Sequence, residues 1–175
     1  VGLMGHGAAK NILEKGHPLT IMGHRNRAPV DDLIKRGAKE GKSAAEIARA
    51  SDILFLCLPS SVEVEATVYG ASGVLEGAHA GLIAVDSTTA DPNSTRRIAA
   101  NLAAKGARML DAPLGRTPKE AEEGLCRPVK GLDVVRVGRT VVQPVRQKWW
   151  IDTLMVVLNH RDIGTRRDRR TRRIA

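Results

Sequence analysis

The sequence is poor in aromatic residues and cysteine and has no long apolar run. Phe, Trp and Tyr make up 2% of its 175 residues, so a core must be built from Ala, Val, Leu and Ile. The longest apolar run, 53–58, is far too short to cross a bilayer, and no charged-then-apolar leader suggests secretion. Cys57 and Cys126 follow no pattern. We therefore expect a cytoplasmic protein in a reducing setting, with no membrane partner.

A metal-binding pattern is also absent from the sequence. Its five histidines show no ligand-like spacing with one another or with cysteine. These histidines are His6, His17, His24, His79 and His160. No metal site is predicted.

The positive charge of the chain lies entirely near its carboxyl end. Residues 126–175 contain 13 Lys and Arg against 4 Asp and Glu, and this excess equals the net charge of +9 of the whole chain. Residues 1–125 are therefore balanced in charge. This asymmetry predicts a domain over 1–124 and a separate basic tail over 125–175.

Helical and strand-like segments alternate up to Gly124, with short connections between them. Strands are predicted at 19–22, 52–58, 82–86 and 108–111, and helices at 8–15, 29–36, 44–50, 60–68, 91–105 and after Thr117. The run 53–58 within the second of these strands is apolar throughout, which is typical of strands buried on both faces. The pattern predicts an α/β fold with a parallel sheet.

Gly2 and Gly5 match the last two glycines of a G-x-G-x-x-G turn. Such a turn joins a buried strand to a helix and lets the backbone approach a pyrophosphate at the helix N-terminus. A helix and a strand follow, as in a βαβ unit. We therefore expect a Rossmann-type, doubly wound sheet that lacks its first, central strand in this sequence, and expect the 175 residues alone to fold poorly.

Four motifs in order make the sequence resemble the β-hydroxyacid dehydrogenase family, which includes 3-hydroxyisobutyrate dehydrogenases and the cofactor domain of 6-phosphogluconate dehydrogenases. The resemblance covers 1–124. It rests on Gly2-Leu3-Met4-Gly5 followed by Asn11, on Leu58-Pro59, on Asp86 with Thr88-Thr89 and Pro92, and on Asp111-Ala112-Pro113. The resemblance implies an oxidoreductase that transfers hydride between a nicotinamide cofactor and a small β-hydroxyacid or its semialdehyde.

The resemblance also implies which residues bind the cofactor. The implied set is Gly2, Leu3, Met4, Gly5, His24, Arg25, Asn26, Leu58, Pro59 and Thr89. A core leucine is an equally good interpretation of Leu58. For Thr89, the alternative to cofactor binding is a residue of a helix-entry loop.

The residues after the strand at 19–22 bear on the choice of cofactor. NAD sites place a carboxylate there for the ribose 2′-hydroxyl, whereas an arginine accommodates the 2′-phosphate of NADP. This chain has Gly23-His24-Arg25-Asn26-Arg27 and no carboxylate before Asp31. The forked guanidinium of Arg25 suits a phosphate, which predicts NADP, with NAD possible. A solvated loop arginine is the alternative.

The sequence departs from the family at the substrate side. Leu114-Gly115-Arg116-Thr117 replaces the family's Ser-Gly-Gly-like loop, so Gly115 and Arg116 are only weak candidates for substrate contact. No Lys-x-x-Asn-Asn pattern follows Gly124, so no catalytic residue is assigned and the family's C-terminal helical domain is taken as absent. Hydride transfer without a positioned acid or base loses a factor of roughly 10²–10⁴, which predicts that this fragment is inactive. The resemblance implies that the intact parent is a homo-oligomer.

Three hypotheses for the tail remain open: an out-of-frame translation, a divergent extension, or an arginine-rich arm that binds nucleic acid. The last is the weakest, because Trp149 and Trp150 are not interleaved with the arginines of 166–173. For the whole chain, the alternatives to an NADP-binding part of an oxidoreductase are a dinucleotide-binding protein without redox chemistry and a nucleic-acid binder.

Overall fold

The computed structural model describes residues 1–23, 25–115, 117–125 and 127–128. The helices are α1 Leu3–Glu14, α2 Ala28–Lys35, α3 Ala44–Arg49, α4 Ser61–Tyr69, α5 Val74–Gly77, α6 Pro92–Ala104 and α7 Pro118–Glu122. The strands are β1 Thr20–Met22, β2 Lys39–Gly41, β3 Ile53–Leu56, β4 Ile83–Asp86, β5 Arg108–Asp111, β6 Leu114–Gly115 and β7 Arg127–Pro128. The predicted tail beyond 128 lies outside the described residues.

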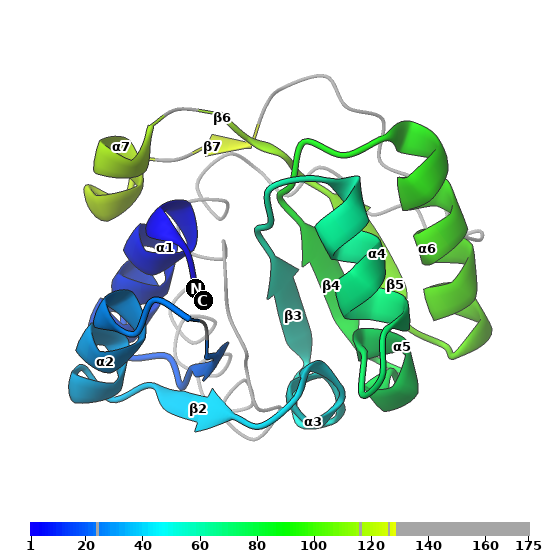
Figure 1. Ribbon diagram of the computed structural model, residues 1–175, viewed down its shortest axis with the longest axis horizontal. Coiled ribbons are helices and arrows are strands. Elements are labelled where there is room, and N and C mark those ends of the chain that lie inside the picture. Colours follow the sequence, from blue (N-terminus) through cyan, green and yellow to red (C-terminus); the bar gives the residue numbers. More distant parts are fainter. Residues whose placement is uncertain (24, 116, 126, 129–175) are drawn as a thin grey trace, which may run out of the picture.

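The longer strands pair in parallel, as predicted (Figure 1). One sheet has the order β3-β4-β5 and the other contains β1 and β2. Register is continuous across the larger sheet, where Leu56 lies beside Asp86 and Asp86 beside Asp111. The alternation of helices with parallel strands confirms an α/β, Rossmann-like fold.

The two parallel sheets are not joined by hydrogen bonds within the described part of the chain. There, β1 pairs with β2 alone, and β3 pairs with β4 alone.

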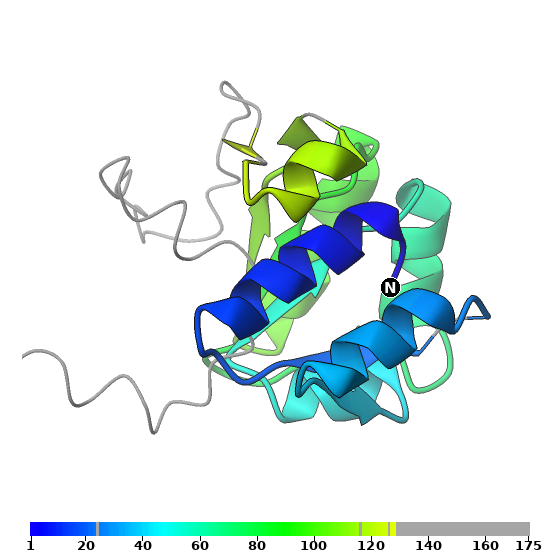
Figure 2. The same cartoon turned by 90° about the vertical axis from the view of Figure 1, so that its left-hand side faces the viewer.

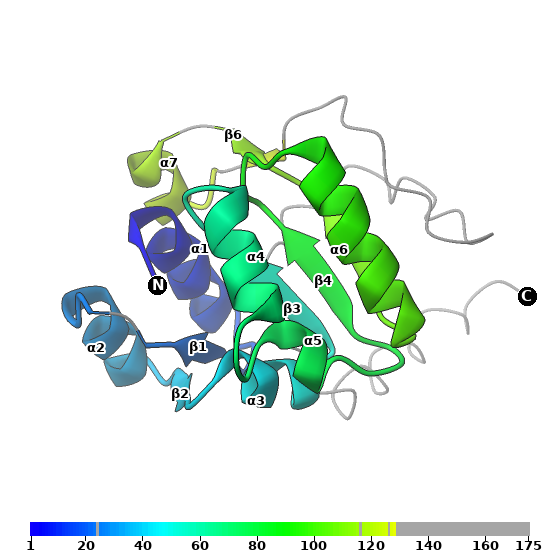
Figure 3. The same cartoon turned by 45° about the vertical axis from the view of Figure 1, so that its right-hand side comes forward.

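Two separate groups of aliphatic side chains fill the interior. The larger lies under β3-β4-β5 and includes Leu54, Val64, Leu82, Ile98 and Leu102. Helices α4 and α6 lie side by side over one face of that sheet (Figure 3). Each fully buried side chain of this kind contributes about 1.5–3 kcal/mol, so aliphatic residues are sufficient for a core.

The smaller group lies between α1, α2 and β1 and includes Ile12, Leu19, Ile21, Val30 and Leu33. It fastens the helix that carries the glycine turn to the β1-β2 sheet. The position of α1 therefore depends on this second core.

Capping residues mark the starts of several helices. The Ser43 hydroxyl accepts a hydrogen bond from the Glu46 amide at 3.1 Å, and Asp91 accepts one from Ser94 at 3.1 Å. Thr117 and Glu120 form a complete capping box. Each cap satisfies an amide that the helix itself leaves without an acceptor.

Several predicted boundaries were wrong. The helix predicted from residue 8 begins at Leu3, so Gly5 lies inside its first turn. The strand predicted over 52–58 covers only Ile53–Leu56. The short elements β2, α5, β6 and β7 were not predicted, because two to four residues are too few to show a periodic pattern.

Helix α7 packs against α1 (Figure 2). Polar side chains form a clamp between the two helices. His6 lies between two carboxylates, with Nδ1 2.5 Å from Glu122 Oε1 and Nε2 2.9 Å from Asp32 Oδ2. Lys10 pairs with the other oxygen of Glu122 at 3.2 Å. The clamp thereby ties α1 to both α2 and α7.

Two further residues of α1 allow this close packing. The Asn11 amide donates to the carbonyls of Gly7 at 2.8 Å and Ala121 at 3.0 Å. A Cβ on Gly7 would lie 2.6 Å from the Ala121 carbonyl carbon, so only glycine fits there. The Asn11 that carries part of the family resemblance thus has a structural role.

We predict that Glu122→Gln destabilises the chain mainly at neutral pH. The hydrogen bond from His6, and then that from Lys10, hold the pKa of Glu122 below its usual range. A carboxyl with a lowered pKa stabilises the fold above its unfolded pKa and loses this effect as pH falls through the lowered value. Thermal unfolding should show a loss of about 2–4 °C at pH 7 that shrinks on acidification.

The matched control is Glu123→Gln, which changes an exposed neighbour of the same charge. Equal losses for the two variants, or a loss from Glu122→Gln that does not depend on pH, would contradict the clamp.

Candidate functional site

The first turn of α1 lies at the edge where β1 and β3 end. The amino nitrogen of Val1 donates to the Met22 carbonyl, the last residue of β1, at 3.3 Å. Burial lowers the pKa of this amino group, and the charge interaction with Cys57, just after β3, opposes that shift. Residues 1–5 therefore lie close to the carboxyl ends of both strands, as a phosphate-binding turn requires.

Gly2 leaves the backbone at the start of this turn accessible. Gly2 is the N-cap of α1 in an extended conformation, and an added Cβ would find no heavy atom within 4 Å. The first helical hydrogen bond runs from the His6 amide to the Gly2 carbonyl at 2.8 Å. The amides of residues 3–5 thus precede the helical ladder and form the positive end of the helix dipole.

Gly5 is buried, and an added Cβ would lie 3.5 Å from Val1 Cγ1, which is ordinary contact. Met4 is half-buried in the same turn. Of the predicted residues here, Gly2 presents the most open backbone.

The loops after β3 and β4 are joined by a buried threonine. The Leu58 amide donates to Thr88 Oγ1 at 3.1 Å, and the Thr88 amide donates to Asp86 Oδ1 at 2.9 Å. Thr89, which the family resemblance singles out, is exposed beside it, as is Pro59. Leu58 packs against the larger core. It therefore has the role of a core leucine, with or without a contact to a ligand.

Asp86 is fully buried at the end of β4, and its Oδ2 has no hydrogen-bond partner among the described residues. Burial raises the pKa of Asp86, against the effect of the Thr88 hydrogen bonds; neighbouring Asp111 raises it further. Burial also raises the pKa of Asp111. Two adjacent carboxyls at this edge therefore keep their protons to a higher pH than a free aspartate does.

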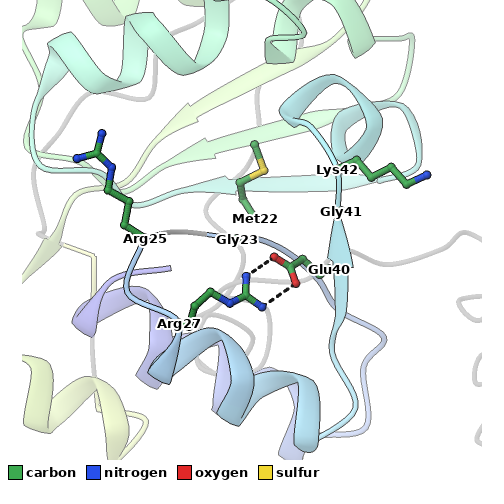
Figure 4. Close-up of a pocket in the computed structure, with 7 residues that line it drawn as sticks. All are labelled: Met22, Gly23, Arg25, Arg27, Glu40, Gly41 and Lys42. Carbon is green, nitrogen blue, oxygen red and sulfur yellow. Dashed lines mark hydrogen bonds and ion pairs between the residues drawn. The ribbon is translucent and has the colours of Figure 1, made fainter.

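A pocket opens beyond the ends of β1 and β2 (Figure 4). Its lining residues are Met22, Gly23, Arg25, Arg27, Glu40, Gly41 and Lys42. The pocket is thus surrounded by the guanidinium groups of Arg25 and Arg27, the ammonium group of Lys42 and the carboxylate of Glu40. The excess of positive charge suits an anionic ligand.

The two arginines of the pocket differ in their partners. Arg27 pairs with Glu40 through both of its terminal nitrogens, at 2.6 and 3.0 Å, and with Asp31 at 3.0 Å. The Arg27 hydrogen bond holds the pKa of Glu40 below its usual range. Arg25 is exposed and has no carboxylate partner among the described residues. It is the guanidinium available to a ligand.

The other predicted site residues are Asn26, Gly115, His24, Arg116 and Leu3. Asn26 accepts a hydrogen bond from the Ala28 amide at 3.2 Å, at the start of α2. Gly115 belongs to β6, which pairs with β7. His24 and Arg116 lie outside the described residues, as does the side chain of Leu3.

Sequence reasoning missed Arg27, Glu40 and Lys42 as pocket residues. Arg27 was read as part of the loop, and the polar sequence Lys39-Glu40-Gly41 gave no strand signal. Glu40 reaches the pocket only because β2 lies parallel to β1, with Glu40 beside Ile21. That register is a tertiary feature.

The described residues contain no group of three His, Cys, Asp or Glu that could hold a metal ion. None of their helices has both the length and the apolar character needed to cross a bilayer.

Residues 1–128 match the protein family described as the NAD binding domain of 6-phosphogluconate dehydrogenase. The 3-sulfolactaldehyde reductase of Escherichia coli is 32% identical over 124 residues, which are 71% of this chain and 41% of that protein. The cytokine-like nuclear factor N-PAC of Xenopus tropicalis is 34% identical over 125 residues, 71% of this chain and 23% of that protein. The chain thus spans less than half the length of either relative.

Solved structures with a similar fold include two at 28% sequence identity. A 3-hydroxyisobutyrate dehydrogenase from Salmonella typhimurium superposes with a TM-score of 0.66 at 28% identity, covering 71% of this chain and 43% of that one. A structure of Psf3 in complex with NADP+ and 2-OPP superposes with a TM-score of 0.65 at 28% identity, covering 71% and 45%.

We predict that Asp86→Asn flattens the pH dependence of stability in the mildly acidic range. A carboxyl with a raised pKa stabilises the fold below its unfolded pKa and loses this effect as pH rises through the raised value. Asparagine retains an acceptor for the Thr88 amide but cannot ionise. As pH rises above the unfolded pKa of Asp86, the free energy of unfolding of the wild type should fall. Asp86→Asn should remove this fall.

Asp111→Asn serves as the comparison, because Asp111 is only half-buried and should change the profile less. An unchanged profile for Asp86→Asn would refute a raised pKa at this position.

Proposed function

We propose the function of this chain from its family, because the chain belongs to the NAD-binding domains of 6-phosphogluconate dehydrogenase. In our proposal it binds the dinucleotide NADP(H) in preference to NAD(H). It serves as the cofactor-binding part of an oxidoreductase that acts on a small β-hydroxyacid or the matching semialdehyde. The observation that carries the proposal is the open glycine turn of α1 at the shared end of β1 and β3, next to a cationic pocket.

The pyrophosphate would bind at the N-terminus of α1. Gly2 leaves the backbone open there, and the amides of residues 3–5 precede the helical ladder. Backbone amides and the helix dipole together favour a negatively charged group.

The adenosine 2′-phosphate would bind in the pocket beyond β1, with Arg25 as its main partner. Arg25 is exposed and lies in the loop after β1, in the region that distinguishes NADP from NAD sites. The charged, forked guanidinium gives short hydrogen bonds to phosphate. A solved relative of the same fold holds NADP+.

The bound nicotinamide would supply the hydride that is exchanged with the substrate. This chain would bind and orient the cofactor, and the loops after β3 and β4 would lie near the nicotinamide end through Leu58, Pro59 and Thr89. We assign no acid or base for the chemical step among the described residues. Turnover therefore belongs to the whole protein of which this domain is a part.

A second candidate function is dinucleotide binding without redox chemistry. It is favoured by the similarity to a protein named as a nuclear factor, which is as great as the similarity to the reductase. The same domain fold supports more than one function, so the binding site alone does not choose between them. Oxidation of NADPH by the whole protein, measured with candidate semialdehydes, separates the two.

We predict that Arg25→Gln weakens NADPH binding by about 10–100-fold and NADH binding by less than about threefold. The reason is the loss of a charge-assisted hydrogen bond to the 2′-phosphate, which NADH lacks. The measurement is a titration of coenzyme fluorescence with the full chain.

The control is Arg108→Gln. Arg108 is exposed at the start of β5, at the opposite edge of the sheet, so its removal changes the net charge equally. If wild-type chain binds neither coenzyme, the proposed function is wrong; if Arg25→Gln weakens both equally, Arg25 does not contact the 2′-phosphate.

We predict opposite outcomes for two glycines of α1. Gly2→Val places its side chain in open space on an extended backbone, so the melting temperature should hold while coenzyme affinity falls about tenfold or more. Gly7→Ala would collide with Ala121 and should lower stability by roughly 1–3 kcal/mol.

Thermal unfolding and fluorescence titration on both variants make the comparison. A Gly2→Val chain that binds coenzyme normally would show that the turn does not hold the pyrophosphate.

A further inference from the structure

A carboxylate lies at the end of β1 although the sequence there contains none. A Cβ built on Gly23, the residue after β1, would lie 2.1 Å from Oε1 of Glu40. The Glu40 carboxylate thus occupies the space in which any residue other than glycine at position 23 would place its side chain. Glu40 comes from the middle of β2 and reaches across to its neighbour.

This position has a chemical meaning in dinucleotide sites. NAD sites of doubly wound sheets place a carboxylate at the end of this strand, where it accepts the ribose 2′-hydroxyl. Glu40 brings the same group to the same place from the adjacent strand.

Both oxygens of this carboxylate are occupied by Arg27. The guanidinium donates to Oε1 at 2.6 Å and to Oε2 at 3.0 Å (Figure 4). It also donates to Asp31 at 3.0 Å. Such a bidentate pair neutralises the carboxylate and uses its best acceptor directions. In the same view, Arg25 and Lys42 extend away from the pair on opposite sides.

We propose that the Arg27–Glu40 pair sets the choice between NADP(H) and NAD(H). While paired, Glu40 neither repels a 2′-phosphate nor accepts a 2′-hydroxyl, and Arg25 binds the phosphate. Without Arg27, the free carboxylate disfavours NADPH by like-charge repulsion and favours NADH by a hydrogen bond. This inference rests on the proposed function and adds two residues that determine its specificity.

Arg27 acts in this proposal as a positioning residue. Its guanidinium is held by two carboxylates, whereas Arg25 lacks such a partner among the described residues. The proposal therefore distinguishes two arginines that lie two positions apart. It also explains why a glycine follows β1, since any side chain there would displace Glu40.

A double-mutant cycle on the full chain tests the proposal. Dissociation constants for NADPH and NADH are measured by fluorescence titration for wild type, Arg27→Gln, Glu40→Gln and the double variant. Arg27→Gln should shift the ratio of the two constants toward NADH by roughly 10–100-fold. Glu40→Gln should keep the preference for NADPH, and the double variant should regain it.

Two controls keep the result interpretable. Lys35→Gln removes one positive charge at the far end of α2 and should leave the ratio unchanged. Arg27→Lys keeps the charge without the forked contact and should give an intermediate shift, which provides a second readout if Arg27→Gln loosens the loop. Thermal unfolding of each variant reports on the fold.

An unchanged ratio in Arg27→Gln overturns the proposal. A double variant that binds NADPH as weakly as Arg27→Gln also overturns it, because Arg27 would then contact the phosphate itself. Failure of the wild type to bind either coenzyme is a different result, which refutes the proposed function and leaves the pair without a ligand to select.

Discussion

Parallel strands impose the constraint on which this structure depends. Neighbouring parallel strands cannot be joined by a tight turn, so each connection must return over the sheet, here largely as a helix. The strands of each parallel sheet then end at the same edge of that sheet, where β1, β3 and β4 place their following loops. The glycine turn of α1 begins at that same edge, within hydrogen-bonding distance of Met22. Residues distant in the sequence thereby come together around a position suited to a phosphate.

The orientation of α1 depends on a network at its outer side. His6, Lys10 and Asn11 all bond to α7. Gly7 permits the two helices to approach closely. Helix α1 thus presents open backbone amides at its first turn, and the side chains that follow are held by hydrogen bonds to α7. A binding turn of this kind needs such a rigid support, because amide positions must match the phosphate oxygens closely.

The pKa values of two carboxyl groups at the edge of the site are shifted in opposite directions. Asp86 is buried with one oxygen unpaired, so burial raises its pKa. Glu40 is partly exposed and paired with Arg27, which lowers its pKa. The first carboxyl organises the loop after β4 through Thr88. The second lies at the surface, where a ligand can compete for it, and is therefore the better candidate for control of specificity.

The sequence alone determined the fold class and predicted where the site would lie. Continuous apolar runs predicted the strands of the larger sheet, a helical pattern over 91–105 predicted α6, and the glycines with Arg25 predicted where a dinucleotide would bind. The predicted strands and helices agree with the structure because their signals are local: each depends on residues within a few positions of one another.

Only the tertiary structure decided which distant groups meet. Glu40 lies beside Gly23 because β2 aligns with β1, His6 bridges α2 and α7 because three helices converge, and Thr88 rather than Thr89 joins two loops because it faces inward. The three-residue strand β2 has no periodic signal of its own. Such contacts arise from packing between elements, and a sequence pattern carries no record of the register in which those elements pack.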